Sequence, residues 1–127
     1  MPVDLLTASV RVLIVDDQES FRSAARLVVE LADGFEVAGE AQTGEEGVRL
    51  VDEIEPNLVL MDINLPGIDG LEATRRIALT HPGVRIVVLS TYDASDYETR
   101  ALAAGAVAFL SKSDFDPGSL AAAWSTG

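Results

Sequence analysis

Five short apolar stretches alternate along the chain with segments whose apolar residues repeat at helical spacing. The stretches cover residues 10–15, 35–39, 58–61, 85–89 and 106–110. They are rich in Val, Ile, Leu and Ala, and polar or turn residues follow each of them. Such a run, bounded by polar residues, predicts a strand that is buried in a parallel sheet. The second stretch is the weakest of the five.

The segments between these strands predict helices. Segment 20–32 places apolar residues three and four positions apart, and Gly34 follows where a C-cap is expected. Thr43 is expected to cap the next helix, with Glu46 as its capping-box partner. Pro117 suits the first position of the last helix. The expected helices cover residues 20–32, 43–54, 71–80, 94–104 and 117–127.

This alternation predicts an α/β fold, with a doubly wound parallel sheet and helices on both of its faces. The 127 residues fit a single domain that spans the whole chain. We expect residues 1–9 to form an N-terminal extension and residues 117–127 to form a short or truncated last helix. No linker, low-complexity stretch or second domain interrupts the pattern.

The composition indicates in which cellular compartment the protein is found. The absence of cysteine excludes disulfides and thiolate metal sites. No apolar run approaches the roughly 20 residues that span a bilayer, and the N-terminus lacks the pattern of a secretory signal. We therefore expect a cytoplasmic protein with no membrane contact.

The charge balance is strongly acidic. Nine Lys and Arg against 21 Asp and Glu give a net charge of −12 and a pI near 4.2. Such a surface repels the phosphates of nucleic acid and anionic lipid. Any DNA contact should therefore come from a separate domain, and this chain alone should bind no nucleic acid. Acidity by itself indicates only solubility. Whether some of the carboxylates form a binding site depends on their positions in the fold.

Polar side chains follow four of the five predicted strands. Asp16 and Asp17 follow the first, Asp62 the third, Ser90 the fourth and Lys112 the fifth. In doubly wound sheets, ligands bind beyond the carboxyl ends of the strands. Three carboxylates gathered there would repel one another unless a cation joined them, and their oxygens suit Mg²⁺. Lys112, the only lysine, could pair with a carboxylate or with an incoming phosphoryl group.

Each of these residues also has a purely structural interpretation. Aspartates after strands often cap helices, Asp62 could belong to a turn, and a single Ser or Lys is uninformative. Their joint placement at the strand ends favours a site.

Several motifs together resemble a known family. Val15-Asp16-Asp17, the run from Leu60 to Gly70, Val88-Leu89-Ser90 and the run from Phe109 to Lys112 are similar to the receiver domain of bacterial two-component response regulators. The stretch from Ser90 to Lys112 further resembles the NarL/FixJ subfamily. The resemblance covers essentially the whole chain and implies a flavodoxin-like (βα)5 sheet with strand order 2-1-3-4-5.

The resemblance also implies a role for each residue at the strand ends. Asp62 would accept a phosphoryl group from the phosphohistidine of a cognate sensor histidine kinase. Asp17 and Asp62 would bind Mg²⁺ together with the backbone carbonyl of Asn64, and Asp16 would hold the metal through water. Lys112 would pair with Asp62 and then with the phosphoryl group. The chain would catalyse only its own phosphorylation and dephosphorylation.

A conformational switch is the second implication. Ser90 would move inward to hydrogen-bond a phosphoryl oxygen, and Phe109 would move into the space that Ser90 leaves. Position alone favours an ordinary core aromatic for Phe109. The surface of the fourth helix, fifth strand and fifth helix would then change, which could drive homodimerisation and regulate transcription through a separate helix-turn-helix domain.

Some positions depart from, or vary within, the family pattern. Ser90 stands where many receivers have Thr, and Ser113 stands where many have Pro, which makes a cis bond after Lys112 costly. Asn64 and Tyr92 occupy positions that tune dephosphorylation. A bulky Tyr92 would shield the acyl phosphate, which predicts slow self-hydrolysis.

Three other function classes share parts of this pattern. A flavodoxin-type cofactor binder needs a phosphate-cradling loop after the first strand, whereas residues 16–19 are acidic. A haloacid-dehalogenase-like phosphatase needs a second Asp where Asn64 stands. A phosphorylation-independent pseudo-receiver, acting as an interaction module, remains the alternative. Of the remaining conspicuous residues, His81 is expected in a solvated loop and Trp124 against the sheet.

Overall fold

The parallel sheet and its covering helices follow the predicted alternation. The computed structural model describes residues 9–91 and 95–126, and its five strands are all parallel in the order β2-β1-β3-β4-β5. The elements in chain order are β1 (Val10–Val15), α1 (Glu19–Leu31), β2 (Phe35–Ala41), α2 (Gly44–Ile54), β3 (Leu58–Asp62), α3 (Gly70–Thr80), β4 (Arg85–Ser90), α4 (Ser95–Ala104), β5 (Ala108–Ser111), a short 3-10 helix (Lys112–Asp114) and α5 (Pro117–Ser125). The predicted fold class and strand order are confirmed.

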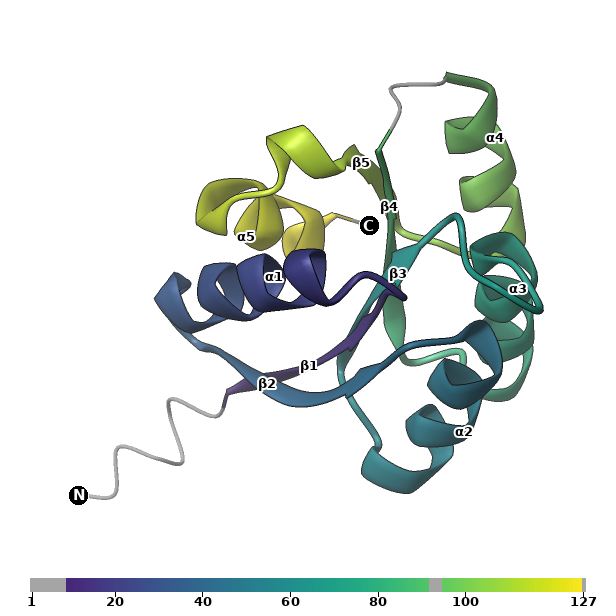
Figure 1. The fold of residues 1–127 in the computed structure, drawn as a ribbon, viewed down its shortest axis with the longest axis horizontal. Coiled ribbons are helices and arrows are strands. Elements are labelled where there is room, and N and C mark those ends of the chain that lie inside the picture. The colour runs from purple at the N-terminus through teal and green to yellow at the C-terminus, as the bar shows by residue number, and fades with distance from the viewer. Residues whose placement is uncertain (1–8, 92–94, 127) are drawn as a thin grey trace.

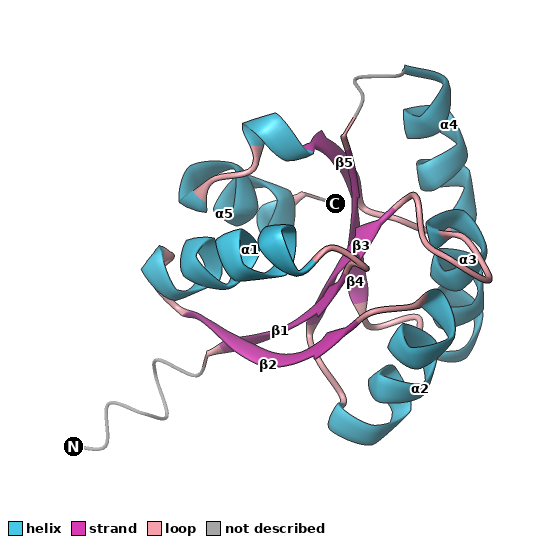
Figure 2. Cartoon of the chain, in the orientation of Figure 1, coloured by secondary structure: helices cyan, strands magenta, loops and turns pink. Residues whose placement is uncertain are grey.

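The helices form one layer on each face of the sheet. Helices α1 and α5 lie on one face, and α2, α3 and α4 lie on the other (Figure 1). Figure 2 shows the central strands between these two layers. Side chains alternate along β1, so that Leu13 and Val15 enter the core beside α2 and α3 while Val12 and Ile14 enter the core beside α1 and α5. Burial on both faces explains the nearly continuous apolar strands.

Strands β3 and β4 each run one residue beyond the prediction, and β2 and β5 differ from it by two residues at one end. Strand β2 continues to Ala41, because its last three residues pair with Leu13, Ile14 and Val15 of β1 after a register shift between Val12 and Leu13. Strand β5 begins at Ala108, two residues later than predicted. The amide of Ala106 donates to the carbonyl of Ala101 at 3.0 Å, so this residue still completes the end of α4.

The predicted caps at the starts of α2 and α5 are largely confirmed, whereas the C-cap of α1 is Ala32 and not Gly34. The side chain of Thr43 accepts from the amide of Glu46, whereas the Glu46 carboxylate bonds the amide of Gln42, one residue before the expected partner. Asp116 caps α5 in a reciprocal capping box with Ser119, and Pro117 occupies the first turn. The N-terminal ends of these two helices therefore follow from local sequence.

His81 lies in the loop after α3, as predicted, but its side chain is only 28% exposed and is paired with other side chains. Its Nε2 lies 2.8 Å from Oδ1 of Asp52, and its Nδ1 lies 2.8 Å from the hydroxyl of Thr80, so the half-buried ring joins the end of α3 to α2. Trp124 packs against the sheet as predicted, with its ring edge-on to Phe35 and beneath the guanidinium of Arg85.

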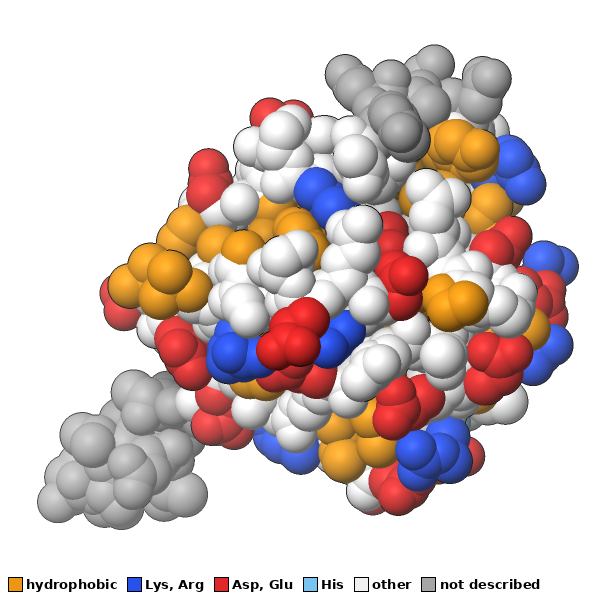
Figure 3. Space-filling model, viewed as in Figure 1, with side chains coloured by type: hydrophobic (Ala, Val, Ile, Leu, Met, Phe, Trp, Pro, Cys, Tyr) orange, Lys and Arg blue, Asp and Glu red, His pale blue; other side chains and the backbone are white. Residues whose placement is uncertain are grey.

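Most carboxylates lie on the surface. Acidic side chains are spread over several elements in Figure 3, with no single dominant patch on this face. Within residues 9–91 and 95–126, no helix is both long enough and apolar enough to cross a membrane.

Candidate functional site

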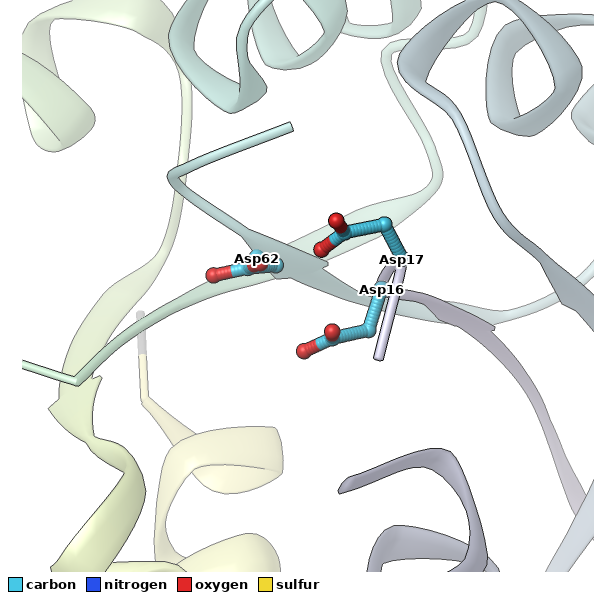
Figure 4. Close-up of side chains that lie close together, drawn as sticks. All are labelled: Asp16, Asp17 and Asp62. Atoms are coloured by element: carbon cyan, nitrogen blue, oxygen red, sulfur yellow. The ribbon is translucent and has the colours of Figure 1, made fainter. Parts of the chain in front are cut away.

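Three carboxylates converge beyond the carboxyl ends of β1 and β3. Asp16 and Asp17 follow β1, and Asp62 is the last residue of β3. Their side chains point into the same space (Figure 4), and one carboxylate oxygen from each lies within 4.8 Å of the others. Asp16 and Asp62 are buried, whereas Asp17 is exposed. The predicted acidic cluster therefore exists in the structure.

Lys112 supplies the positive charge of this cluster. Its Nζ lies 2.6 Å from Oδ2 of Asp16 and 3.5 Å from Oδ1 of Asp62, and its side chain is only 11% exposed. The ammonium also lies 4.4 Å from the ring centroid of Phe21, on α1. A protonated amine over an aromatic face is attracted by the ring quadrupole, so Phe21 helps to fix the lysine over the two aspartates.

The environment of Asp62 disfavours its charged form. Burial, followed by the negative charge of Asp16, raises the pKa of Asp62 to about 6. Lys112 and the amide of Asn64, which donates to Asp62 Oδ1 at 3.4 Å, act in the opposite direction. The carboxyl is therefore mostly ionised at neutral pH, and a further cation nearby would lower its pKa.

The turn after β3 brings α3 close to the backbone of Asp62. Asp69 caps α3 by accepting from the amide of Glu72 at 2.8 Å. The amide of Gly70 donates to the carbonyl of Ile63 at 3.0 Å. A Cβ on Gly70 would lie 2.1 Å from the carbonyl oxygen of Asp62, which is far inside contact distance. Only glycine allows this approach.

A cavity of about 330 Å³ opens over the cluster. Its lining residues are Asp17, Gln18, Asp62, Asn64, Thr91 and Lys112. Gln18 and Thr91 were not predicted, although each directly follows a predicted site residue. The cavity leaves room for a small anionic group beside Asp62.

Ser90 and Phe109 lie on the face of the sheet that α2, α3 and α4 cover. Ser90 is buried at the end of β4, two residues after Val88, and therefore points to the same face. Phe109 pairs with Val88 across the β4–β5 ladder and is half-buried in the same apolar cluster. Tyr92 lies outside the described residues. The peptide bond between Lys112 and Ser113 is trans.

The donor set suits a hard divalent cation. The cluster offers carboxylate oxygens and no nitrogen or sulfur ligand, which favours Mg²⁺ or Ca²⁺ over softer metals. Asp17 is exposed at the cavity wall, where a hydrated ion can reach it. The residues present therefore fit the magnesium site that the sequence predicts.

The chain is similar to several response regulators. Response regulator GacA of Pseudomonas viridiflava is 39% identical over 103 residues, which is 81% of this chain and 48% of that protein. Response regulator UvrY of Escherichia coli K12 is 40% identical over 103 residues, 81% of this chain and 47% of that protein. The chain thus spans about half the length of the curated relatives it matches.

Solved structures agree with these sequence relatives. A two-component response regulator of the LuxR family from Aurantimonas superposes with a TM-score of 0.83 and 34% identity, over 91% of this chain and 81% of that chain. The signal receiver domain of the response regulator NarL from Mycobacterium tuberculosis superposes with a TM-score of 0.83 and 28% identity, over 93% of this chain and 98% of that chain. These neighbours support the NarL/FixJ-like subfamily. Residues 12–124 match the family described as response regulator receiver domain, and the chain belongs to that family.

Proposed function

We propose that Asp62 accepts a phosphoryl group from the phosphohistidine of a sensor histidine kinase. One observation carries the proposal: Asp62 lies in the wall of an open cavity, with two other aspartates and Lys112 gathered around it. A structural cluster would bury these charges in pairs, whereas here Asp17 and the cavity stay open to solvent.

The same residues would hold Mg²⁺. Asp17 and Asp62 would bind it through carboxylate oxygens, Asn64 through its backbone carbonyl, and Asp16 through water. A bound magnesium ion would neutralise phosphoryl oxygens that otherwise face three carboxylates.

Chemically, a carboxylate oxygen of Asp62 would attack phosphorus. The new O–P bond forms as the P–N bond to the kinase imidazole breaks, and the electron pair of that bond returns to the imidazole nitrogen. Because the carboxyl is mostly ionised at neutral pH, the step needs no general base. The ammonium of Lys112 would then pair with the phosphoryl oxygens instead of the aspartates. It already lies 2.6 Å from Asp16 and 3.5 Å from Asp62, so only a small movement is needed.

Ser90 and Phe109 would then transmit a conformational change from the phosphorylated Asp62 to the protein surface. The phosphoryl group carries about 1.5–2 negative charges where the ionised carboxylate carried one, and the hydroxyl of Ser90 would hydrogen-bond one of its oxygens. Phe109 lies in the apolar cluster on the same face of the sheet. Movement of Phe109 into the space that Ser90 leaves would change the surface of α4, β5 and α5. Phosphorylation would thereby increase the population of this second conformation.

The lifetime of the phosphorylated state would depend on Asn64 and Tyr92. Asn64 lines the cavity, and Tyr92 would shield the acyl phosphate from water. We expect slow self-hydrolysis. A Tyr92→Ala variant should therefore lose its phosphoryl group faster, as followed by intact mass over time, and an equal or longer half-life would contradict the shielding role.

The whole protein would act in the cytoplasm as a regulator of transcription. This chain covers about half of relatives that are named as response regulators, and DegU of Brevibacillus brevis, a transcriptional regulatory protein, is 37% identical over 81% of this chain and 44% of its own. A separate helix-turn-helix domain would bind DNA, and phosphorylation would favour a homodimer.

Incubation with acetyl phosphate or phosphoramidate and Mg²⁺, followed by intact mass, tests the acceptor. We expect a gain of one phosphoryl group that requires Mg²⁺ and is lost in Asp62→Asn. No gain under any of these conditions would instead support the phosphorylation-independent interaction module.

A further inference from the structure

A buried arginine stands behind the acidic cluster. Arg22, on the first turns of α1, is 8% exposed and is the only basic residue buried to this degree among residues 9–91 and 95–126. Burying a guanidinium is costly unless its donors are used. Its contacts therefore indicate what it does.

The guanidinium of Arg22 binds the backbone at the end of β1. Its Nη1 donates to the carbonyl oxygen of Asp16 at 2.7 Å, and both partners are buried. Strand β1 ends at Val15, so this carbonyl lies past the last residue of the strand. Because a buried carbonyl without a donor is expensive, Arg22 stabilises this particular orientation of the peptide that joins Asp16 to Asp17.

Two further hydrogen bonds complete the frame around Asp16. Its amide donates to the carbonyl of Ala41 at 3.0 Å, and its Oδ1 accepts from the amide of Gln18 at 2.8 Å. The backbone of the acidic pair is thus fixed on one side by β2 and on the other by Arg22. The side-chain direction of Asp17, which has no such contact of its own in the described hydrogen bonds, depends on that backbone.

Glu40 fixes the arginine in turn. The Nε of Arg22 lies 3.4 Å from Oε1 of Glu40, on β2. Arg26, one helical turn further along α1, donates to both carboxylate oxygens of Glu40 at 2.8 and 3.1 Å. Arg26 has a side chain that is 41% exposed and no described contact with Asp16. Two arginines on the same helix therefore share one carboxylate, and only one of them reaches the site.

From these contacts we infer that Arg22 is a positioning residue for the metal-binding function, holding Asp16 and Asp17 in the orientation that a divalent cation requires. The inference rests on the proposed function, since it assigns Arg22 to the magnesium site. Residues that orient metal ligands typically change metal affinity by about 10–100-fold when removed. Arg22 acts through the backbone and need not touch the ion.

The test compares Arg22→Met with Arg26→Met. Methionine keeps the apolar stem and removes the guanidinium, and both changes take one positive charge and one Glu40 partner from α1. Magnesium affinity is measured by calorimetry with Mg²⁺ alone. We expect Arg22→Met to weaken it by about tenfold or more and Arg26→Met by less than about twofold. An equal loss in both variants, or no loss in Arg22→Met, would overturn the inference.

A second readout needs no metal. Amide hydrogen exchange at Asp17 and Gln18 should accelerate in metal-free Arg22→Met and stay unchanged in Arg26→Met. If Arg22→Met does not fold, Arg22→Lys serves in its place. Lysine keeps the charge but loses the planar donor geometry, so it should still weaken magnesium binding, and an affinity equal to that of the wild type would contradict the positioning role.

Phosphorylation separates this inference from the proposed function. With acetyl phosphate, Arg22→Met should need a higher Mg²⁺ concentration for half-maximal labelling of Asp62 but reach the wild-type rate at saturation. A wild-type chain that binds no Mg²⁺ and accepts no phosphoryl group would refute the proposed function. A wild-type chain that does both, beside an Arg22→Met variant with unchanged magnesium dependence, would refute the inference alone.

Discussion

Lys112 lies closer to Asp16 than to Asp62, with its Nζ 2.6 Å from the first carboxylate and 3.5 Å from the second. The family resemblance implies Asp62 as its partner, yet the ammonium contacts both carboxylates at once. A single buried cation thus offsets the repulsion of two buried carboxylates. This relationship makes the stability of the metal-free protein depend on Lys112.

Replacing Lys112 with methionine should destabilise the metal-free protein. The change leaves Asp16, which is 1% exposed, without its cation. Removing one partner of a buried charge pair costs about 3–5 kcal/mol, and we expect about 2–4 kcal/mol because the cluster lines an open cavity. Urea unfolding in the presence of a chelator measures this difference in the free energy of unfolding between Lys112→Met and the wild type. Arg49→Met, which breaks exposed ion pairs on α2, should cost no more than about 1 kcal/mol.

Asp62 should make the metal-free protein less stable as pH rises from about 4 to 7. Its native pKa is about 6 against 3.8 ordinarily, so the native state holds this proton more tightly than the unfolded chain does. The stability that the bound proton supplies is present at low pH and lost as pH rises through 6. Asp62→Asn removes the penalty and should stabilise the protein at pH 7 by up to about 3 kcal/mol.

Urea unfolding of both proteins at several pH values between 4 and 7 checks this expectation. The advantage of Asp62→Asn should be small at pH 4 and should grow with pH. The exposed Asp33 supplies a control, Asp33→Asn. A difference between wild type and Asp62→Asn that stays constant across the range would show that the carboxyl titrates normally.

Gly70→Ala should destabilise the fold and displace the site. The added Cβ would lie 2.1 Å from the carbonyl oxygen of Asp62, and because that atom is backbone, α3 or the end of β3 must move. Overpacking of this kind costs about 1–3 kcal/mol or more. Gly83→Ala is the matched control, since nothing lies within 4 Å of its Cβ position, and its stability should change by less than about 1 kcal/mol. Equal unfolding midpoints in urea would contradict the close approach.

The fold and the acidic cluster could be predicted because both depend on local pattern. Apolar runs mark the buried strands, and four of the five runs are followed by polar residues of the site, as Val15 is by Asp16 and Met61 by Asp62. The apolar pattern predicts the start of β5 two residues early, because Ala106 and Val107 are as apolar as the strand itself. Sequence alone could not tell that the amide of Ala106 is used by α4.

Contacts between elements could not be predicted in the same way. Phe21 and Arg22 lie on an amphipathic helix, and nothing in its sequence marks them as site residues. The packing of α1 against the end of β1 brings them to Lys112 and Asp16. The pair between His81 and Asp52 was missed for the same reason, since it depends on α2 lying beside α3. Residues that support the site from helices carry no motif of their own.

Ser90→Ala should separate phosphorylation from the conformational change. Under the proposed function Ser90 receives the signal only after Asp62 is labelled, so the variant should still gain one phosphoryl group by intact mass. The change at α4 and β5 should be lost, because no hydroxyl remains to bond the phosphoryl oxygen. Amide hydrogen exchange of residues 97–111, with and without acetyl phosphate and Mg²⁺, measures that change.

The matched variant for this experiment is Ser90→Thr, which keeps the hydroxyl and adds one methyl group. Ser90 is 1% exposed at the end of β4, so the extra methyl tests whether the buried site accepts the larger side chain that many receivers carry. Threonine should retain the phosphorylation-dependent exchange pattern, whereas alanine should not. If alanine and serine respond alike, the switch operates without the Ser90 hydroxyl, and the proposed coupling between Asp62 and Phe109 through Ser90 is contradicted.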